Sequence, residues 1–214
     1  MPDNLTIKHS QPDVKISKNT ATAEVRQQKR ALRKALSDID QQQHSRALRD
    51  TISKQTNYRN SQHIACYLAN DGEIDPGILI EHAWFANKQV YLPVLSPIKN
   101  SLYFAPYDEG STFRLNRFNI AEPVCHPSKW KNAQQLDLLL LPLVAFDSSG
   151  NRVGMGGGFY DRTLAYLSHR HHWKKPVLMG LAHEIQKTDQ LVSQHWDIPL
   201  DYIATEKQLY TVGQ

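Results

Sequence analysis

Five short apolar runs divide the chain into regular segments, and they cover residues 63–69, 89–95, 136–141, 177–182 and 202–205. Each run has the length of a β-strand, and the run at 136–141 is apolar at nearly every position. Strands that are buried on both faces show such continuous runs, whereas strands exposed on one face alternate. The pattern therefore predicts a central sheet whose two faces are both covered.

Segments between these runs have the spacing of amphipathic helices. Val25, Leu32 and Leu36 share one face of a helix predicted over residues 23–37. A second helix is expected to run to about residue 54, with Ser37 or Asp38 as its N-cap.

The segment between the first two apolar runs contains a further helix start, because Asp75 precedes Pro76 and proline suits the first helical position. The order strand, helix, strand is typical of a parallel sheet. Two short strands, residues 102–105 and 113–115, are expected to pair antiparallel with each other. Together these elements predict a three-layer α/β sandwich with a mostly parallel central sheet and helices on both faces.

Residues 1–22 are polar and aperiodic, and we expect a flexible tail there, followed by a single domain over residues 23–214. The 214 residues suffice for one substantial core, with 40% hydrophobic and 21% charged residues. No apolar run approaches the ~20 residues that span a bilayer, and no secretory signal is recognisable. Two cysteines, Cys66 and Cys125, are too few for a disulfide framework, so we expect a cytoplasmic protein with no membrane partner.

The formal net charge is +4, which suits either anionic small ligands or nucleic acid. The first predicted helix carries a stripe of cations: Arg26, Lys29, Arg30, Arg33 and Lys34. We interpret most of them as a solvated helix face, and expect one or two to reach a polyphosphate.

Residues 152–162 hold the most informative motif, R-V-G-M-G-G-G-F-Y-D-R, with four glycines in five positions. Backbone without Cβ atoms can approach an anion closely, and free N–H groups before a helix, expected here over residues 163–167, form a phosphate cradle. Arg152 and Arg162 add fork-shaped donors, and Asp161 adds an oxygen ligand for a metal. The motif predicts phosphate binding, and a tight turn that merely starts a helix is the alternative.

Neither common nucleotide fingerprint fits these glycines. No lysine follows them as in a Walker loop, and Phe159 stands where a dinucleotide-binding loop has its third glycine. A dinucleotide oxidoreductase is therefore disfavoured. A basic nucleic-acid-binding protein is the other alternative, although no recognised module supports it.

The longest match to a known family runs from residue 141 to residue 162, L-P-L-V-A-F-D-S-S-G-N-R-V-G-M-G-G-G-F-Y-D-R. It resembles the P-x-x-A-F-D-x-x-G-x-R-L-G-x-G-x-G-Y-Y-D-R pattern of the 5-formyltetrahydrofolate cyclo-ligase family, also called 5,10-methenyltetrahydrofolate synthetase. Weaker matches follow the family's order at residues 67–75, 90–95, 119–123 and 196–201. The resemblance covers roughly residues 23 to 210. It implies an ATP- and Mg²⁺-dependent enzyme that converts 5-formyltetrahydrofolate to 5,10-methenyltetrahydrofolate, releasing ADP and phosphate.

The resemblance also implies site residues. For ATP these are Arg26, Arg152, Val153, Gly154, Met155, Gly156, Gly157, Gly158, Phe159 and Tyr160. For the folate they are Leu68, Glu73, Met155, Gly156, Gly157, Gly158 and Phe159. Arg152 and Tyr160 are the implied catalytic residues, and Asp161 and Asp197 the implied Mg²⁺ ligands. The implied partners are ATP and 5-formyltetrahydrofolate, with or without a polyglutamate tail, and no nucleic acid; we expect a monomer.

Several of these residues have a plain structural alternative. Glu73 also suits the first turn of a helix, Asp161 suits a helix cap, and Leu68 and Tyr160 suit a core. Asp197 is simply an acid in a loop.

Two positions depart from the family pattern. The family opens with K-x-x-L-R, and the equivalent T-A-E-V-R here retains Arg26 but has Thr22 in place of the lysine. Lys29 or Arg30 is a candidate replacement. Phe159 stands where many relatives have tyrosine.

Overall fold

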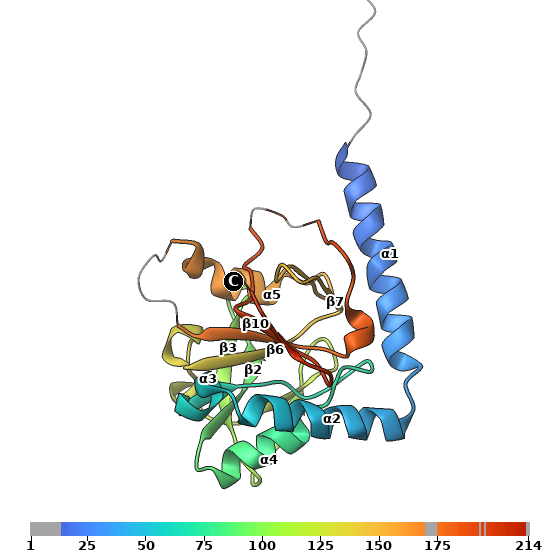
Figure 1. Cartoon of the computed structure of the whole chain (residues 1–214). Helices are drawn as coiled ribbons and strands as arrows, with labels where there is room; N and C mark the ends of the chain where they lie inside the picture. The colour runs from blue at the N-terminus through green and yellow to red at the C-terminus, as the bar shows by residue number, and fades with distance from the viewer. Residues whose placement is uncertain (1–13, 170–174, 193, 195, 213–214) are drawn as a thin grey trace, which may run out of the picture.

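The computed structural model describes residues 14–169, 175–192, 194 and 196–212, and its centre is a seven-stranded sheet (Figure 1). The strand order is β11-β10-β9-β6-β1-β2-β3. The strands are β1 (His63–Ala65), β2 (Gln89–Leu95), β3 (Leu102–Tyr107), β6 (Leu138–Pro142), β9 (Val177–Leu181), β10 (Tyr202–Ala204) and β11 (Leu209–Thr211). Neighbours from β10 to β2 are parallel, and only the edge strands β3 and β11 run antiparallel. The predicted mostly parallel sheet is confirmed.

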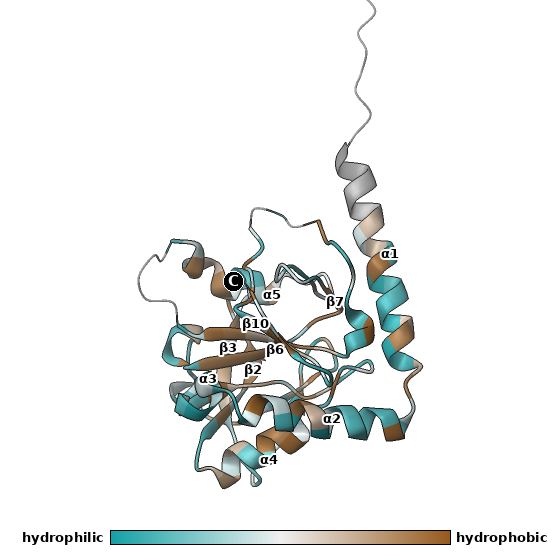
Figure 2. Ribbon diagram, in the orientation of Figure 1, coloured by the Kyte–Doolittle hydropathy of each residue, from teal (hydrophilic) through white to brown (hydrophobic). Residues whose placement is uncertain are grey.

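Alternate residues of β6 point into two separate cores. Leu138 and Leu140 pack toward α2 (Asp38–Ser53), α3 (Thr56–Asn60) and α4 (Gly77–Phe85). Leu139 and Leu141 pack on the other face, toward α5 (Phe159–Leu164) and the 3₁₀ helix η3 (Ala165–His169). Figure 2 shows the apolar strands between these layers. Both faces are buried, which explains the continuous apolar runs and confirms the three-layer prediction.

Two predicted helix starts are found within one residue of where the sequence placed them. Ser37 caps α2, because its side-chain oxygen accepts a hydrogen bond from Asp40 N at 3.1 Å. Pro76 is the N-cap residue of α4, and Asp75 Oδ1 accepts from Gly77 N at 2.9 Å. By contrast, the helix expected over 163–167 is displaced, since α5 begins at Phe159, directly after the glycines.

Helix α1 (Val14–Lys34) packs against the 3₁₀ helix η4 (Glu184–Gln186), which follows the carboxyl end of β9 (Figure 1). Helical backbone therefore extends over residues 14–22, where an irregular tail was expected, and residues 1–13 lie outside the described residues. The prediction that the cationic stripe of this helix is a solvated face was wrong. Lys29 Nζ donates to the carbonyl oxygens of Ile185 and Lys187 at 2.9 and 2.5 Å. The other four cations also bind groups outside α1: Arg26 binds Gly154 O, and Arg30, Arg33 and Lys34 bind Asp71.

The expected pairing of the two short strands was also wrong. β3 pairs with β2, whereas β4 (Phe113–Leu115) pairs with β5 (Ala121–Pro123) in a separate hairpin. A third two-stranded unit, β7 (Ala145–Phe146) with β8 (Arg152–Val153), leads into the glycines. Two more 3₁₀ helices, η1 (Pro127–Lys129) and η2 (Ala133–Gln135), connect β5 to β6.

Gly180, near the end of β9, allows the core to pack closely. A Cβ atom at this position would lie 2.6 Å from the Cδ atoms of Leu143 and of Leu200, both of which are buried. We therefore expect Gly180→Ala to lower the free energy of unfolding by about 1–3 kcal/mol, measured by urea denaturation. Gly110→Ala is the matched control, because its Cβ would come no closer than 3.6 Å to Asp108. Equal stability of the two variants would contradict this packing argument.

Within the described part of the chain, no helix has the length and apolar character needed to span a membrane.

Candidate functional site

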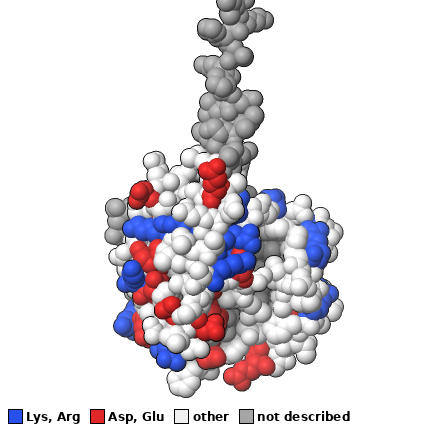
Figure 3. Space-filling view, turned by 90° about the vertical axis from the view of Figure 1, so that its right-hand side faces the viewer, with Lys and Arg blue, Asp and Glu red and all other residues white. Residues whose placement is uncertain are grey.

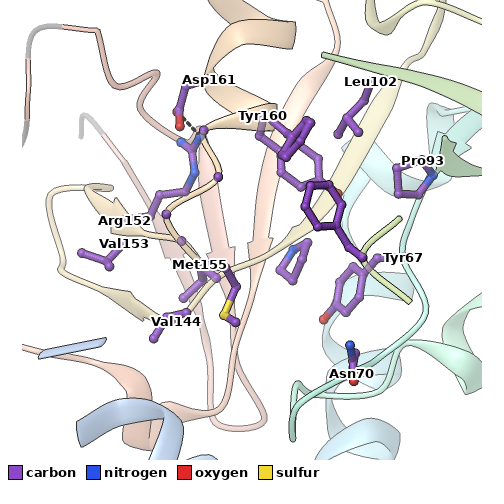
Figure 4. A pocket seen from close by; sticks show the side chains of 18 of the residues that line it. Tyr67, Asn70, Pro93, Leu102, Val144, Arg152, Val153, Met155, Tyr160 and Asp161 are labelled. Atoms are coloured by element: carbon purple, nitrogen blue, oxygen red, sulfur yellow. Dashed lines mark hydrogen bonds and ion pairs between the residues drawn. The ribbon is translucent and has the colours of Figure 1, made fainter. Parts of the chain in front are cut away.

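A cavity of about 800 Å³ opens beyond the carboxyl ends of β1 and β6. The chain proceeds from β1 outward to β2 and from β6 outward to β9, so these neighbours mark the switch point of the sheet. Ligands bind at such points in open α/β folds. Figure 4 shows the walls, with Tyr67 and Asn70 after β1 on one side and Met155 on the glycine loop opposite. Every residue that the family resemblance assigned to the site lines this cavity, although their roles stay predictions. Arg162, also considered as a phosphate donor, is not among the lining residues and donates to Asn100 O and Gly157 O instead.

The glycine loop, residues 154–158, runs from β8 to α5 and is largely exposed. Gly156 and Gly158 have φ values of +95° and +62°, which glycine adopts without a Cβ penalty. Among the described residues, none accepts a hydrogen bond from the backbone N–H groups of the loop. Unpaired amides on an exposed bend offer donors to an anionic ligand.

Arg26 connects α1 to this loop. Its Nε donates to the carbonyl oxygen of Gly154 at 2.8 Å, and the side chain lines the cavity. Thr22 lines the cavity one turn earlier. Lys29 binds the carbonyl oxygen of Ile185 in η4, and Arg30 binds Asp71 at 2.7 Å. Neither side chain therefore occupies the position that the family's lysine would have.

Arg152 and Asp161 form an ion pair across the glycine loop, with Nη2 and Oδ1 2.6 Å apart (Figure 4). Arg152 also donates from Nη1 to the carbonyl oxygen of Ile198. Its side chain is 8% exposed, so the guanidinium is oriented in advance rather than free in solvent. Asp161 lies in the first turn of α5, but its carboxylate is directed to Arg152.

The two predicted Mg²⁺ ligands line the same cavity. Asp161 comes from α5 and Asp197 from the loop before β10, where Asp197 Oδ2 accepts from Gln194 N at 2.7 Å. Their carboxylate oxygens suit a hard cation.

Another group with metal-binding side chains, His44, His183 and Glu206, lies near the ends of β9 and β10. The two Nδ1 atoms are 2.8 Å apart, which fits a hydrogen bond. Two nitrogens on one tetrahedral zinc would be about 3.3 Å apart. We therefore interpret the two histidines as a hydrogen-bonded pair, with Glu206 Oε1 3.8 Å from His44 Nε2.

Glu73 lies in the turn after β1, before α4 begins, so it is not the helix residue that was considered as the alternative. Its Oε2 accepts from Asn70 N at 3.2 Å, and Leu68 lines the cavity nearby. Burial raises the pKa of Glu73 to about 7, and the Arg33 guanidinium, 3.7 Å from Oε1, opposes that rise. A carboxylate with these surroundings changes charge near neutral pH.

Two aromatic residues close the far end of the glycine loop. Tyr160 packs against the core on the α5 face and also lines the cavity, and burial raises the pKa of its hydroxyl above the usual range. Phe159 meets Phe118 of the β4–β5 hairpin edge to face, with ring centroids 5.6 Å apart. Tyr160 is thus both a core residue and a wall of the site.

Sequence reasoning missed two residues at this site. Phe118 lines the cavity from the β4–β5 hairpin, and its only sequence signal was a neighbouring match at residues 119–123. Arg33 is fully buried beneath the site, and its signal was its position in the cationic stripe.

Comparison with known proteins agrees with the geometry. The family model described as the 5-formyltetrahydrofolate cyclo-ligase family matches residues 18–206. The chain is 39% identical over 178 residues to a 5-formyltetrahydrofolate cyclo-ligase of Haemophilus influenzae, covering 83% of this chain and 93% of that protein. It is 43% identical over 148 residues to the protein of that name in Escherichia coli, covering 69% and 79%. The NMR structure of Aquifex aeolicus 5,10-methenyltetrahydrofolate synthetase superposes with a TM-score of 0.76 at 27% identity, covering 90% of this chain and 93% of that one. The chain belongs to the 5-formyltetrahydrofolate cyclo-ligase family, as the motif at residues 141–162 predicted.

Proposed function

We propose that this cavity binds 5-formyltetrahydrofolate and MgATP side by side and closes the folate to 5,10-methenyltetrahydrofolate, with release of ADP and phosphate. The observation that carries the proposal is the glycine loop, residues 154–158, whose amides have no acceptor among the described residues, on the same cavity as the largely buried carboxyl group of Glu73. One wall offers donors to an anion, and the other offers an acceptor to a donor-rich ring.

The reaction needs a leaving group, because a formamide oxygen leaves poorly. The formyl oxygen attacks the γ-phosphate of ATP and displaces ADP. N10 of the folate then adds to the activated carbon, and the C–O bond breaks as phosphate departs with the proton that N10 loses. Phosphoryl transfer of this kind depends on positioning and charge neutralisation.

The glycine loop binds the triphosphate in this scheme. Its N–H groups donate to phosphate oxygens, and Arg152 neutralises charge on the transferred group, with Arg26 assisting from α1. The remaining loop-side contacts come from Val153, Met155, Phe159 and Tyr160. Tyr160 lies where nucleotide and folate meet.

Asp161 and Asp197 would hold the Mg²⁺ that accompanies ATP. Their fit is chemical, since both present carboxylate oxygens to the nucleotide side of the cavity. The ion would neutralise phosphate charge when bound. Asp161 would then share its carboxylate between the ion and Arg152, from which it is now 2.6 Å away.

Glu73 recognises the pterin in this scheme. An ionised carboxylate is an acceptor only, which matches the amino and ring N–H donors of the pterin edge. Leu68 packs on the ring, and the loop residues Met155 to Phe159 separate folate from nucleotide.

The direct test mixes the purified protein with 5-formyltetrahydrofolate and MgATP and follows the near-ultraviolet absorbance of methenyltetrahydrofolate. Product formation that requires both substrates is the expected result. Binding of RNA with steep salt dependence and no turnover would instead favour the nucleic-acid-binding alternative. Among the residues that Figure 3 colours by charge, acidic and basic side chains are interspersed on the face toward α1, which does not favour that alternative.

Glu73→Gln is expected to raise KM for 5-formyltetrahydrofolate by about tenfold to a hundredfold, because an amide donates where only an acceptor fits. KM for ATP is expected to change little. In the wild type, whose Glu73 has a pKa of about 7, folate binding should strengthen as the pH rises from 6 to 8, since the carboxylate then forms. The variant should lack this dependence, and an unchanged pH profile would contradict the role of Glu73.

A monomeric state, a cytoplasmic location and use of polyglutamylated folate complete the proposal. Sedimentation of the purified protein with and without substrates tests the first of these.

A further inference from the structure

Arg33 is a fully buried cation in the last turn of α1. Its Nε donates to the carbonyl oxygen of Asp71 at 2.8 Å, and Nη2 donates to Asp71 Oδ2 at 2.8 Å. Its Nη1 donates to the carbonyl oxygen of Leu143 at 3.2 Å. A buried guanidinium is tolerated only with such partners. Through these hydrogen bonds the Arg33 guanidinium links α1 to the loop after β1 and to the loop after β6.

The turn that carries Glu73 is held from the same side. Asn70 O accepts from Glu73 N at 3.0 Å, and the two central residues, Asp71 and Gly72, have φ values of +55° and +73°. This is the φ pattern of a type I′ turn, in which a left-handed non-glycine residue is disfavoured without support. Arg33 supports this conformation, because it donates hydrogen bonds to both the backbone carbonyl oxygen and the carboxylate of Asp71.

The same guanidinium lies between the two halves of the site. Nη2 is 3.7 Å from Glu73 Oε1 and 4.0 Å from Met155 Sδ. One end of the cation therefore faces the folate side of the cavity, and it also touches a residue of the glycine loop.

We infer that Arg33 is a positioning residue for the folate: it fixes the turn at residues 70–73 and keeps the carboxylate of Glu73 ionised and directed into the cavity. The inference rests on the proposed function, since it assigns a task to the partner of a proposed folate ligand.

The charges around Glu73 support this role. Arg33 faces it from α1, Asp71 lies in the same turn, and Tyr67 and Tyr160 lie close enough for Glu73 to raise their pKa values. Burial and Asp71 raise the pKa of Glu73, whereas Arg33 is the cation that lowers it. Loss of Arg33 would thus raise the pKa of Glu73 further, and a larger fraction would be protonated at neutral pH.

The test measures kcat/KM for 5-formyltetrahydrofolate against pH in the wild type, Arg33→Met and Arg33→Lys. On the acidic side of the profile, kcat/KM falls as Glu73 is protonated, and we call this part the acidic limb. For Arg33→Met we expect the midpoint of the acidic limb to move upward by about one pH unit, with the loss in kcat/KM largest at low pH. Arg33→Lys keeps the positive charge but loses the several fixed N–H donors of the guanidinium. It should raise KM for the folate and shift the acidic limb less than Arg33→Met does. In the Glu73→Gln background, Arg33→Met should have a much smaller effect on KM for the folate.

Arg30→Met is the matched control. Arg30 also binds Asp71, at 2.7 Å, but it is partly exposed, and no contact of it with Glu73 occurs among the described residues. Its acidic limb should coincide with that of the wild type. If the wild type is active and the pH profile of Arg33→Met shows no shift relative to it, the inference is wrong. If Arg33→Met does not fold, wild-type KM and pH profile in Arg33→Lys would overturn it. A wild type that forms no product would instead contradict the proposed function.

Discussion

Gly157→Asp is expected to abolish turnover of ATP, with a loss of more than about 100-fold in kcat/KM for the nucleotide. Gly157 lies in the middle of the loop whose amides we assign to the triphosphate. A Cβ at this position would come within 2.9 and 3.1 Å of the Phe159 ring, so the loop and the ring must both shift. The added carboxylate would also place a negative charge against the phosphates.

Gly157→Asn separates these two causes, because asparagine has the shape of aspartate without its charge. If phosphate binds here, the asparagine variant should retain clearly more activity than the aspartate variant. Steady-state kinetics with varied ATP gives both values, and circular dichroism checks that each variant is folded. Near wild-type kinetics in Gly157→Asp would remove the loop from the nucleotide site.

The glycine loop could be found from the sequence because its signal is local. Glycines, flanking arginines and an aspartate are adjacent along the chain, so their relative placement needs no tertiary information. The central sheet was predictable for a similar reason, since burial of β6 on both faces leaves an apolar run within a single segment. The residue at which a strand ends was harder to predict from the sequence. β1 ends at Ala65 although the apolar run continues, because Cys66 and Tyr67 leave the strand and still remain buried, Cys66 in the core and Tyr67 also in the wall of the site.

The predictions that failed depend on contacts between distant segments. Helical spacing predicted that the cations of α1 share one side of the helix. It could not predict that they bind Asp71 and carbonyl oxygens near η4, because these partners are distant in sequence. Likewise, the composition of residues 113–115 indicated a strand without naming its partner. β2 took β3 as its antiparallel neighbour across a short connection, and this left β4 to pair with β5. Arg33 and Phe118 joined the site through such long-range contacts.

Arg152→Met is expected to lower kcat on the order of 10³-fold, the range found when a single arginine that stabilises a phosphoryl group is lost. Arg152 is held by Asp161 and by the carbonyl oxygen of Ile198, so its charge is directed toward the nucleotide side of the cavity before any ligand arrives. Methionine retains much of the length but neither the charge nor the fork. Arg162→Met, in α5 directly after the glycine loop, is the control, because Arg162 is exposed and donates to Asn100 O and Gly157 O. Its loss should stay within about tenfold.

The ion pair with Asp161 offers a second explanation for such a loss, since removing Arg152 leaves that carboxylate without its cation. The single variant Asp161→Asn and the double variant Arg152→Met with Asp161→Asn separate the two explanations, because any loss of Mg²⁺ binding at Asp161 is common to both. If Arg152 served only to balance Asp161, the two variants should have equal kcat. If Arg152 acts on the transferred phosphoryl group, kcat of the double variant should lie far below that of Asp161→Asn. Equal kcat values would therefore assign Arg152 to the structure of the site rather than to the reaction.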